Sequence, residues 1–86
     1  MTKESIIKRV YEIIYQIEGL KNLDKLQDDT WLFEECGLDS ASVIELVVLL
    51  EEEFGFEYDA ASLDLRKFAN INRISDNIML RLGMNG

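Results

Sequence analysis

The sequence predicts an all-α fold: a small four-helix bundle of three main helices and one short helix, with a long loop between the first and second helices. Apolar residues recur at steps of three and four in three separate stretches, which is the spacing of one helix face. No stretch shows the sustained alternation of a strand. The 86 residues are 48% hydrophobic and 30% charged, which suits one modest core. We therefore expect one domain over residues 1–86, ordered over about 5–82, with a short C-terminal tail.

The first helix is expected over about residues 3–18. Thr2 is a residue type that caps helix N-termini, and Gly19 readily adopts the left-handed conformation that ends a helix. The apolar stripe between them steps by four, three, one and three residues: Ile6, Val10, Ile13, Ile14 and Ile17.

Residues 20–39 lose this periodicity and collect Asn, Asp and Gly, which indicates a long connection. Connections of this length are uncommon in compact domains and are often functional. The segment is also rich in apolar side chains, which we expect to hold it against the core: Leu20, Leu23, Leu26, Trp31, Leu32, Phe33 and Leu38.

The second main helix is predicted to begin at Asp39 and Ser40, two residue types that cap helices, and to end at Phe54 before Gly55. Its core face carries Leu46, Val47, Leu50 and Phe54. The residues outside that face include Ala41, Ile44 and Val48. They indicate either a second contact surface or a helix surrounded by several neighbours, and the sequence leaves both interpretations open.

Beyond Gly55, Asp59 is expected to cap a short helical turn that carries Ala60, Ala61 and Leu63. A last helix is predicted to begin after Asn70 as its cap. Its apolar stripe steps by three, four and four residues: Ile71, Ile74, Ile78 and Leu82. Residues 83–86 are expected to form a frayed end.

The net charge of −8 is concentrated in one stretch, because residues 26–65 contain twelve acidic residues and no Lys or Arg. Such a surface repels phosphate backbones and anionic headgroups, so nucleic acid and membranes are poor partners. Basic protein surfaces are better ones. An acidic excess can also serve solubility alone, and this alternative stays open.

The residue types exclude much of enzyme chemistry. The chain has no His, which removes His-based bases, triads and metal ligands. Cys36 is the one cysteine, so neither an internal disulfide nor a Cys-x-x-Cys site can form, and a small core hydrophobe is the simplest interpretation. No signal peptide or membrane-length apolar run is visible, so we expect a cytoplasmic protein. Nothing in the sequence demands more than a monomer.

Ser40 is the candidate for chemistry, because it opens a helix after a glycine-containing loop. A helix N-terminus favours a phosphate by about 0.3–1 kcal/mol at an exposed site. A nucleophilic role would need a nearby base, and no His or Lys lies between residues 26 and 66. Ser40 is therefore better suited to be modified by another enzyme than to attack a substrate. An ordinary capping role for Asp39 or Ser40 remains the alternative.

The runs Gly37-Leu38-Asp39-Ser40, Glu45-Leu46-Val47 and Leu50-Glu51-Glu52-Glu53-Phe54 resemble the acyl and peptidyl carrier protein family, and the likeness extends over about residues 5–82. In that family the serine receives 4′-phosphopantetheine from coenzyme A through a phosphopantetheinyl transferase. The thiol of this arm carries acyl or aminoacyl groups as thioesters. The resemblance implies a carrier and not an enzyme, with Ser40 as the attachment point and Asp39 as its motif neighbour, a contact for the transferase.

The resemblance also implies partner enzymes that present basic patches to the second main helix. These are an acylating or adenylating enzyme and downstream synthase or tailoring enzymes. Their contacts map to Ala41, Ile44, Glu45, Val48, Glu51 and Glu52. Many family members have leucine where this chain has Ala41, so the choice of partner is open.

The stretch from Phe68 to Ile74 is more similar to discrete carriers of polyketide or peptide-synthetase pathways in secondary metabolism than to fatty-acid carriers, which are the alternative. A non-covalent acidic helical adaptor is a second alternative. A calcium-binding protein is disfavoured, because residues 24–35 lack the mid-loop glycine and Asp28 and Asp29 are adjacent where calcium ligands alternate. No metal is expected.

Overall fold

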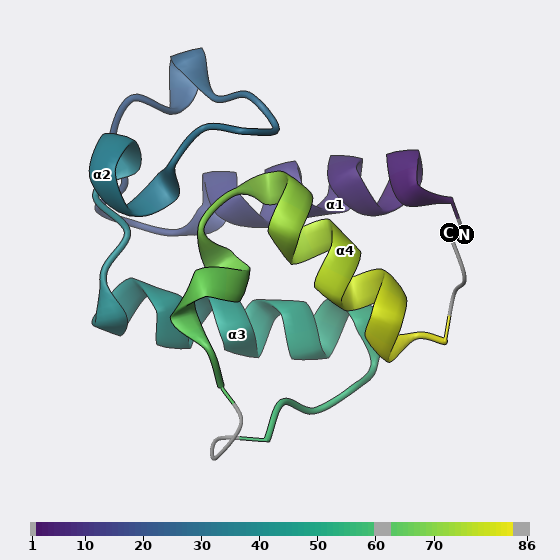
Figure 1. Cartoon of the computed structure of the whole chain (residues 1–86). Helices are drawn as coiled ribbons and strands as arrows, with labels where there is room; N and C mark the ends of the chain where they lie inside the picture. The colour runs from purple at the N-terminus through teal and green to yellow at the C-terminus, as the bar shows by residue number, and fades with distance from the viewer. Residues whose placement is uncertain (1, 60–62, 84–86) are drawn as a thin grey trace.

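The computed structural model describes residues 2–59 and 63–83, and within them the chain is helical with no strand, as predicted. The main helices are α1 (Lys3–Gln16), α3 (Ser40–Phe54) and α4 (Ile71–Arg81). Shorter elements connect them: η1 (Leu23–Lys25), α2 (Leu32–Cys36) and η3 (Leu65–Phe68). In Figure 1, α1 lies above α3 and α4 crosses obliquely between them, so that α1 contacts both. None of the helices in the described residues is long and apolar enough to cross a bilayer.

Thr2 caps α1 as predicted. It forms a reciprocal capping box with Ser5, in which the Ser5 N–H donates to Thr2 Oγ1 (3.2 Å) and the Thr2 N–H donates to Ser5 Oγ (3.1 Å). The helix ends at Gln16, two residues before the predicted end. The reason is that Ile17 turns to an extended backbone (φ −80°, ψ 121°), which keeps its side chain in the core.

The long connection is held against the core by its apolar residues, as expected. Leu32 and Leu38 are buried, and four others are partly buried against the core: Leu20, Leu23, Leu26 and Phe33. Trp31 is the exception, because 47% of it is exposed. The connection contains a short helix, α2, that the loss of periodicity over residues 20–39 does not predict. There Leu32 and Cys36, four residues apart on one helix face, are both fully buried.

Backbone and side-chain hydrogen bonds also tie this connection to the bundle. The Tyr11 hydroxyl donates to Asp28 Oδ1 (2.6 Å), and the Asn72 N–H donates to the Asp28 carbonyl (3.0 Å). Further along, the Leu32 N–H donates to the Ala69 carbonyl (2.8 Å). The loop before α3 is therefore fixed to both α1 and the start of α4.

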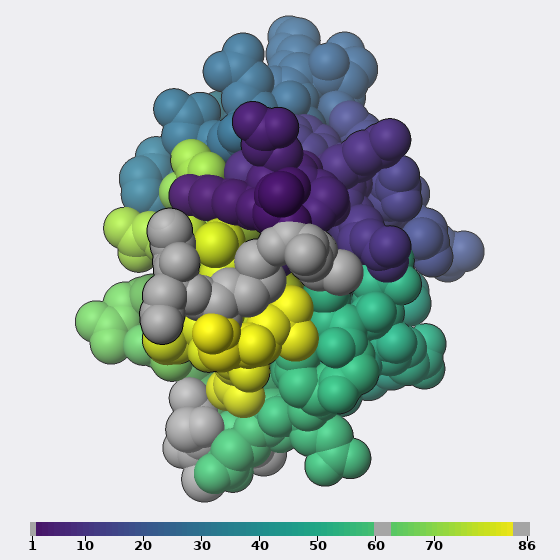
Figure 2. Space-filling view, turned by 90° about the vertical axis from the view of Figure 1, so that its right-hand side faces the viewer, coloured from purple at the N-terminus to yellow at the C-terminus, as the bar shows by residue number. Residues whose placement is uncertain are grey.

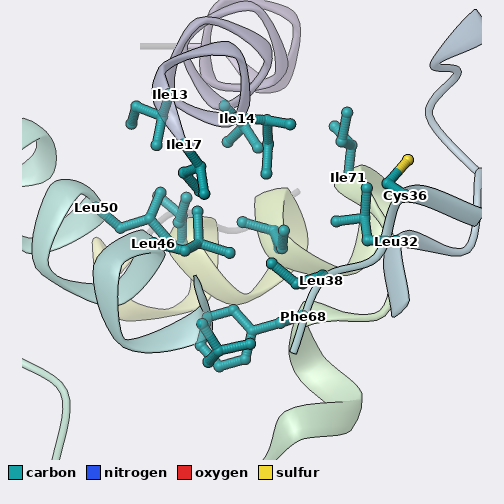
Figure 3. Close-up of a cluster of buried hydrophobic side chains, with 14 of the residues drawn as sticks. Ile13, Ile14, Ile17, Leu32, Cys36, Leu38, Leu46, Leu50, Phe68 and Ile71 are labelled. Carbon is teal, nitrogen blue, oxygen red and sulfur yellow. The ribbon is translucent and has the colours of Figure 1, made fainter. Parts of the chain in front are cut away.

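The core is one cluster in which side chains from α1, α2, α3, η3 and α4 meet (Figure 3). Cys36 belongs to it with no exposed surface, and burial raises the pKa of its thiol. This confirms its interpretation as a small core residue. The buried hydrophobic residues are Ile6, Val10, Ile13, Ile14, Ile17, Leu32, Cys36, Leu38, Val43, Leu46, Leu50, Phe68, Ile71, Ile74 and Ile78.

The C-terminal part agrees with the prediction at its start and differs at its end. Asn70 caps α4 by accepting the Arg73 N–H (2.8 Å). The helix ends at Arg81, so Leu82 stands at the C-cap, exposed, and not in the core stripe. The short turn expected after Asp59 falls on residues 60–62, which lie outside the described residues, as do 84–86 of the expected frayed end.

Candidate functional site

Ser40 is the first residue of α3, and an anchored turn leads into it. Gly37 ends α2 in the left-handed conformation (φ 76°), where a side chain would be strained. The next residue, Leu38, is buried and donates its N–H to the Leu32 carbonyl (3.0 Å). The chain is therefore fixed immediately before Asp39 and Ser40, and it turns both of them out to solvent.

Asp39, and not Ser40, is the N-cap of α3. The Ser42 N–H donates to Asp39 Oδ1 (2.9 Å), and the Asp39 N–H donates to Ser42 Oγ (2.8 Å). These hydrogen bonds, the one from the Ser42 backbone first, lower the pKa of Asp39. The Ser40 hydroxyl is exposed and has no hydrogen-bond partner among the described residues. The structure thus separates the capping role from the serine whose chemistry is in question.

The hollow beside the start of α3 is acidic. It is shallow, with a volume of about 270 Å³. Its acidic members are Glu18, Asp39 and Glu45, and no Lys or Arg is among the described residues that line it: Glu18, Gly19, Leu20, Gly37, Asp39, Ala41, Ser42 and Glu45. A serine here lacks the amine or imidazole base that activates a nucleophile, but its hydroxyl is open to another enzyme.

One side of α3 faces solvent and combines apolar and acidic residues. Ile44 is 64% exposed and Val48 is 44% exposed, although both are apolar. Their exposure favours the interpretation of a second contact surface over that of a helix buried all round. We call this surface the α3 outer face, and it consists of Ala41, Ile44, Glu45, Val48 and Glu52.

Glu51 differs from the other predicted contact residues. It is partly buried, and its Oε2 accepts the backbone N–H of Tyr58 (2.8 Å). Its neighbour Glu53 is paired with Arg9 at 3.1 Å. Glu52 has no such partner among the described residues. These internal roles depend on the chain folding back after Gly55 and on α1, so the run of three glutamates carries no local signal for them.

Comparison with known proteins gives one family and several relatives. The family model described as "Phosphopantetheine attachment site" matches residues 8–78, a range that includes Ser40. An acyl carrier protein of Thermotoga maritima is 30% identical over 82 residues, covering 95% of this chain and 98% of the relative. Acyl carrier proteins of Cyanidium caldarium and Chlorobium phaeobacteroides are each 29% identical over 79 residues, which is 92% of this chain, and 88% and 97% of those proteins.

Proposed function

Because this chain belongs to the phosphopantetheine attachment-site family of acyl carrier proteins, which are non-catalytic carriers with a covalently bound 4′-phosphopantetheine arm, we propose that Ser40 is the residue that bears the arm. The observation that supports this most directly is the state of the Ser40 hydroxyl. It is exposed and unbonded among the described residues, because Asp39 takes the cap of α3. A transferase could reach it without breaking any contact of the fold.

The residues at this position suit a phosphodiester linkage, although they hold it loosely. The amide dipoles at the start of α3 favour an anion there by about 0.3–1 kcal/mol. The carboxylates of Asp39 and Glu45 oppose it, and no basic side chain lines the adjacent hollow among the described residues. The arm supplies a terminal thiol that holds an acyl group as a thioester. Ser40 would anchor this arm while the acidic surroundings leave it free to swing.

We propose that the α3 outer face is the docking surface for partner enzymes. Glu45 and Glu52 would face basic patches, and Ile44 and Val48 would add apolar contact. Ala41 offers little apolar area beside the arm. Each exposed ion pair adds only about 0.2–1 kcal/mol, so docking should be fast, salt-sensitive and weak. Such binding suits a carrier that visits several enzymes.

We propose that the pathway is of polyketide or peptide-synthetase type and that the arm carries acyl or aminoacyl groups in the cytoplasm. The support is the stretch from Phe68 to Ile74 and the presence of Ala41 after the serine. The alternative is a fatty-acid carrier, which the names of the relatives favour, since all three are acyl carrier proteins. Loading separates the two: an adenylating enzyme that charges the arm with an amino acid would support the first, and elongation by fatty-acid synthase enzymes would support the second.

The attachment site is tested by intact mass. The purified protein is incubated with coenzyme A and a broad-specificity phosphopantetheinyl transferase, and we expect the mass of one added arm. Ser40→Ala should gain none, whereas Ser42→Ala, a matched loss of a hydroxyl two residues away, should still gain one arm. Modification of Ser40→Ala, or no modification of the unaltered protein by several such transferases, would refute the assignment. In that case an adaptor that binds without modification becomes the better interpretation.

A further inference from the structure

A second candidate surface lies on the flank of the molecule away from α3. In Figure 2 the segment around η3 (green) is at the left and α3 (teal) is at the right, with the end of α4 (yellow) between them. A hollow of about 300 Å³ opens between η3 and α4. We call it the η3–α4 patch, and it is lined by Arg66, Lys67, Arg73, Asp76, Asn77 and Leu80.

Two charged members of this patch are neutralised within the chain. Arg66 donates two hydrogen bonds to the carboxylate of Asp64, at 3.1 and 3.0 Å. Asp76 pairs with Lys3 at 2.9 Å. Both pairs lie at the surface, and in each pair the positive charge offsets the negative one. The remaining residues therefore decide the charge that a partner would meet.

Two cations of the patch remain uncompensated. Lys67 and Arg73 have no carboxylate within ion-pair distance among the described residues. The Arg73 guanidinium lies over the ring of the half-exposed Trp31, 5.6 Å from its centroid. This contact leaves its charge in place and available. The patch is thus a basic site on a protein whose net charge is −8.

The patch also has apolar and polar groups that lack partners. Leu80 is 74% exposed, the largest exposed fraction among the large hydrophobic residues of the described chain, and Leu65 of η3 is exposed as well. Asn77 is only 8% exposed, yet its side-chain carbonyl oxygen has no hydrogen-bond partner in the described residues. Buried polar atoms normally have a partner, so Asn77 is an unsatisfied position beneath the hollow, and the exposed Leu80 is the group that a partner can cover.

We propose that the η3–α4 patch binds an acidic segment of a partner protein that also presents an apolar side chain. Carboxylates of the segment would face Lys67 and Arg73, and its apolar side chain would cover Leu80. A phosphate polymer or an anionic membrane is disfavoured, because the chain as a whole carries a net charge of −8 and repels an extended polyanion. A short protein segment interacts mainly within the screening length of about 8 Å and meets the local positive charge.

The residues that line this patch include none of the α3 outer face and none of the hollow beside the start of α3, so binding here leaves both uncovered. A partner held here would keep the protein near an enzyme while α3 stays available, which raises the effective concentration of whatever Ser40 carries. The binding itself does not require Ser40 to be modified. A failure of the binding test and a failure of the attachment test are therefore separate results.

The test is a titration of the 15N-labelled protein with a synthetic helical peptide that places Glu and Leu on one face. We expect backbone amide shifts at Lys67, Arg73 and Leu80 and none along the α3 outer face. Lys67→Glu combined with Arg73→Glu should weaken binding about tenfold or more. The matched control, Lys8→Glu combined with Lys25→Glu, changes the net charge equally at exposed positions and should weaken it less than about twofold.

Leu80→Ser is a second variant, which tests the apolar contact with the partner. Because Leu80 is exposed, this substitution should leave the fold intact. We expect it also to weaken binding. An equal loss in the lysine control, shifts centred on α3, or no binding at all would overturn the proposal. It would also be overturned if phosphatidylserine vesicles or a DNA oligonucleotide shifted the same amides as strongly as the peptide, since the patch would then be a polyanion site. Shifts at the patch on concentrating the protein alone would identify a second copy as the occupant and equally contradict the proposal.

Discussion

The carboxylate of Asp39 accepts the backbone N–H of Ser42 at 2.9 Å, and the Ser42 hydroxyl accepts the Asp39 N–H at 2.8 Å. This reciprocal cap starts α3 without using the hydroxyl of Ser40, the residue directly after Asp39. Capping and attachment can therefore be altered separately, although the two side chains are adjacent in sequence.

Removing the cap should destabilise α3. Asp39→Ala is expected to lower Tm by on the order of 5 °C, because one N-terminal N–H of the helix loses its acceptor. Asp39→Asn should retain most of the stability, since asparagine caps as well as aspartate. Thermal denaturation by circular dichroism measures both. Equal Tm values for all three proteins would mean that the cap contributes nothing.

The same cap predicts an acid-dependent loss of stability. Its hydrogen bonds lower the pKa of Asp39 below its usual value of 3.8, so the stabilisation by the charged form is present above that value. It is lost as the pH falls through the lowered pKa of the folded state. The stability advantage of the unaltered protein over Asp39→Ala should therefore shrink below about pH 4, whereas that of Asp39→Asn should not. Urea midpoints across this pH range measure the difference.

A buried hydroxyl on α4 offers a stabilising substitution. Ser75 has no exposed surface, and its Oγ has no hydrogen-bond partner in the described residues. Ser75→Ala removes this unsatisfied group and should raise the free energy of unfolding by about 1 kcal/mol. Ser40→Ala, the same change at an exposed site, should alter it by less than about 0.5 kcal/mol. A loss of stability in Ser75→Ala on urea unfolding would show that the hydroxyl is satisfied by water.

The starts of the helices are the part of the fold that sequence predicts best, because caps are local. Thr2, Asp39 and Asn70 all cap as expected or within the expected pair. The sequence does not predict helix α2, because its five residues carry little periodic signal. The helix forms because Leu32 and Cys36 are buried against other elements.

Sequence likewise predicts one part of the candidate site and not another. Ser40 at a helix start follows from its neighbours. That its hydroxyl is free does not follow, because it depends on Asp39 having an extended backbone (φ −137°, ψ −177°) while Ser40 is already helical. The internal role of Glu51 was equally hidden, since it requires the chain after Gly55 to fold back and bring the Tyr58 N–H to its carboxylate.

Gly37 and Gly55 share the left-handed backbone conformation, so the same substitution at both positions should separate an effect on stability from an effect on attachment of the arm. Gly37 (φ 76°) leads into Ser40, whereas Gly55 (φ 74°) ends α3 at its far end. Each change to alanine should cost about 1–2 kcal/mol in the free energy of unfolding, because an L-residue is disfavoured in the left-handed region. Only Gly37→Ala should also slow the transfer of the arm to Ser40 under conditions where both variants are folded. Equal transfer rates would show that the turn does not present the serine.

The acidic residues of α3 should divide into docking and structural groups. Glu45→Lys, on the α3 outer face, should raise the KM of the phosphopantetheinyl transferase about two- to fivefold with little change in Tm, because it reverses one exposed attraction to a basic partner. Glu51→Gln should instead lower Tm, because the Tyr58 N–H loses a charged acceptor, and it should leave KM unchanged while the protein is folded. Steady-state kinetics at low and high salt check both, since the effect of Glu45→Lys should fade as salt screens the pair. An increase in KM for Glu51→Gln equal to that for Glu45→Lys would contradict this division, because it would place Glu51 in the docking contact.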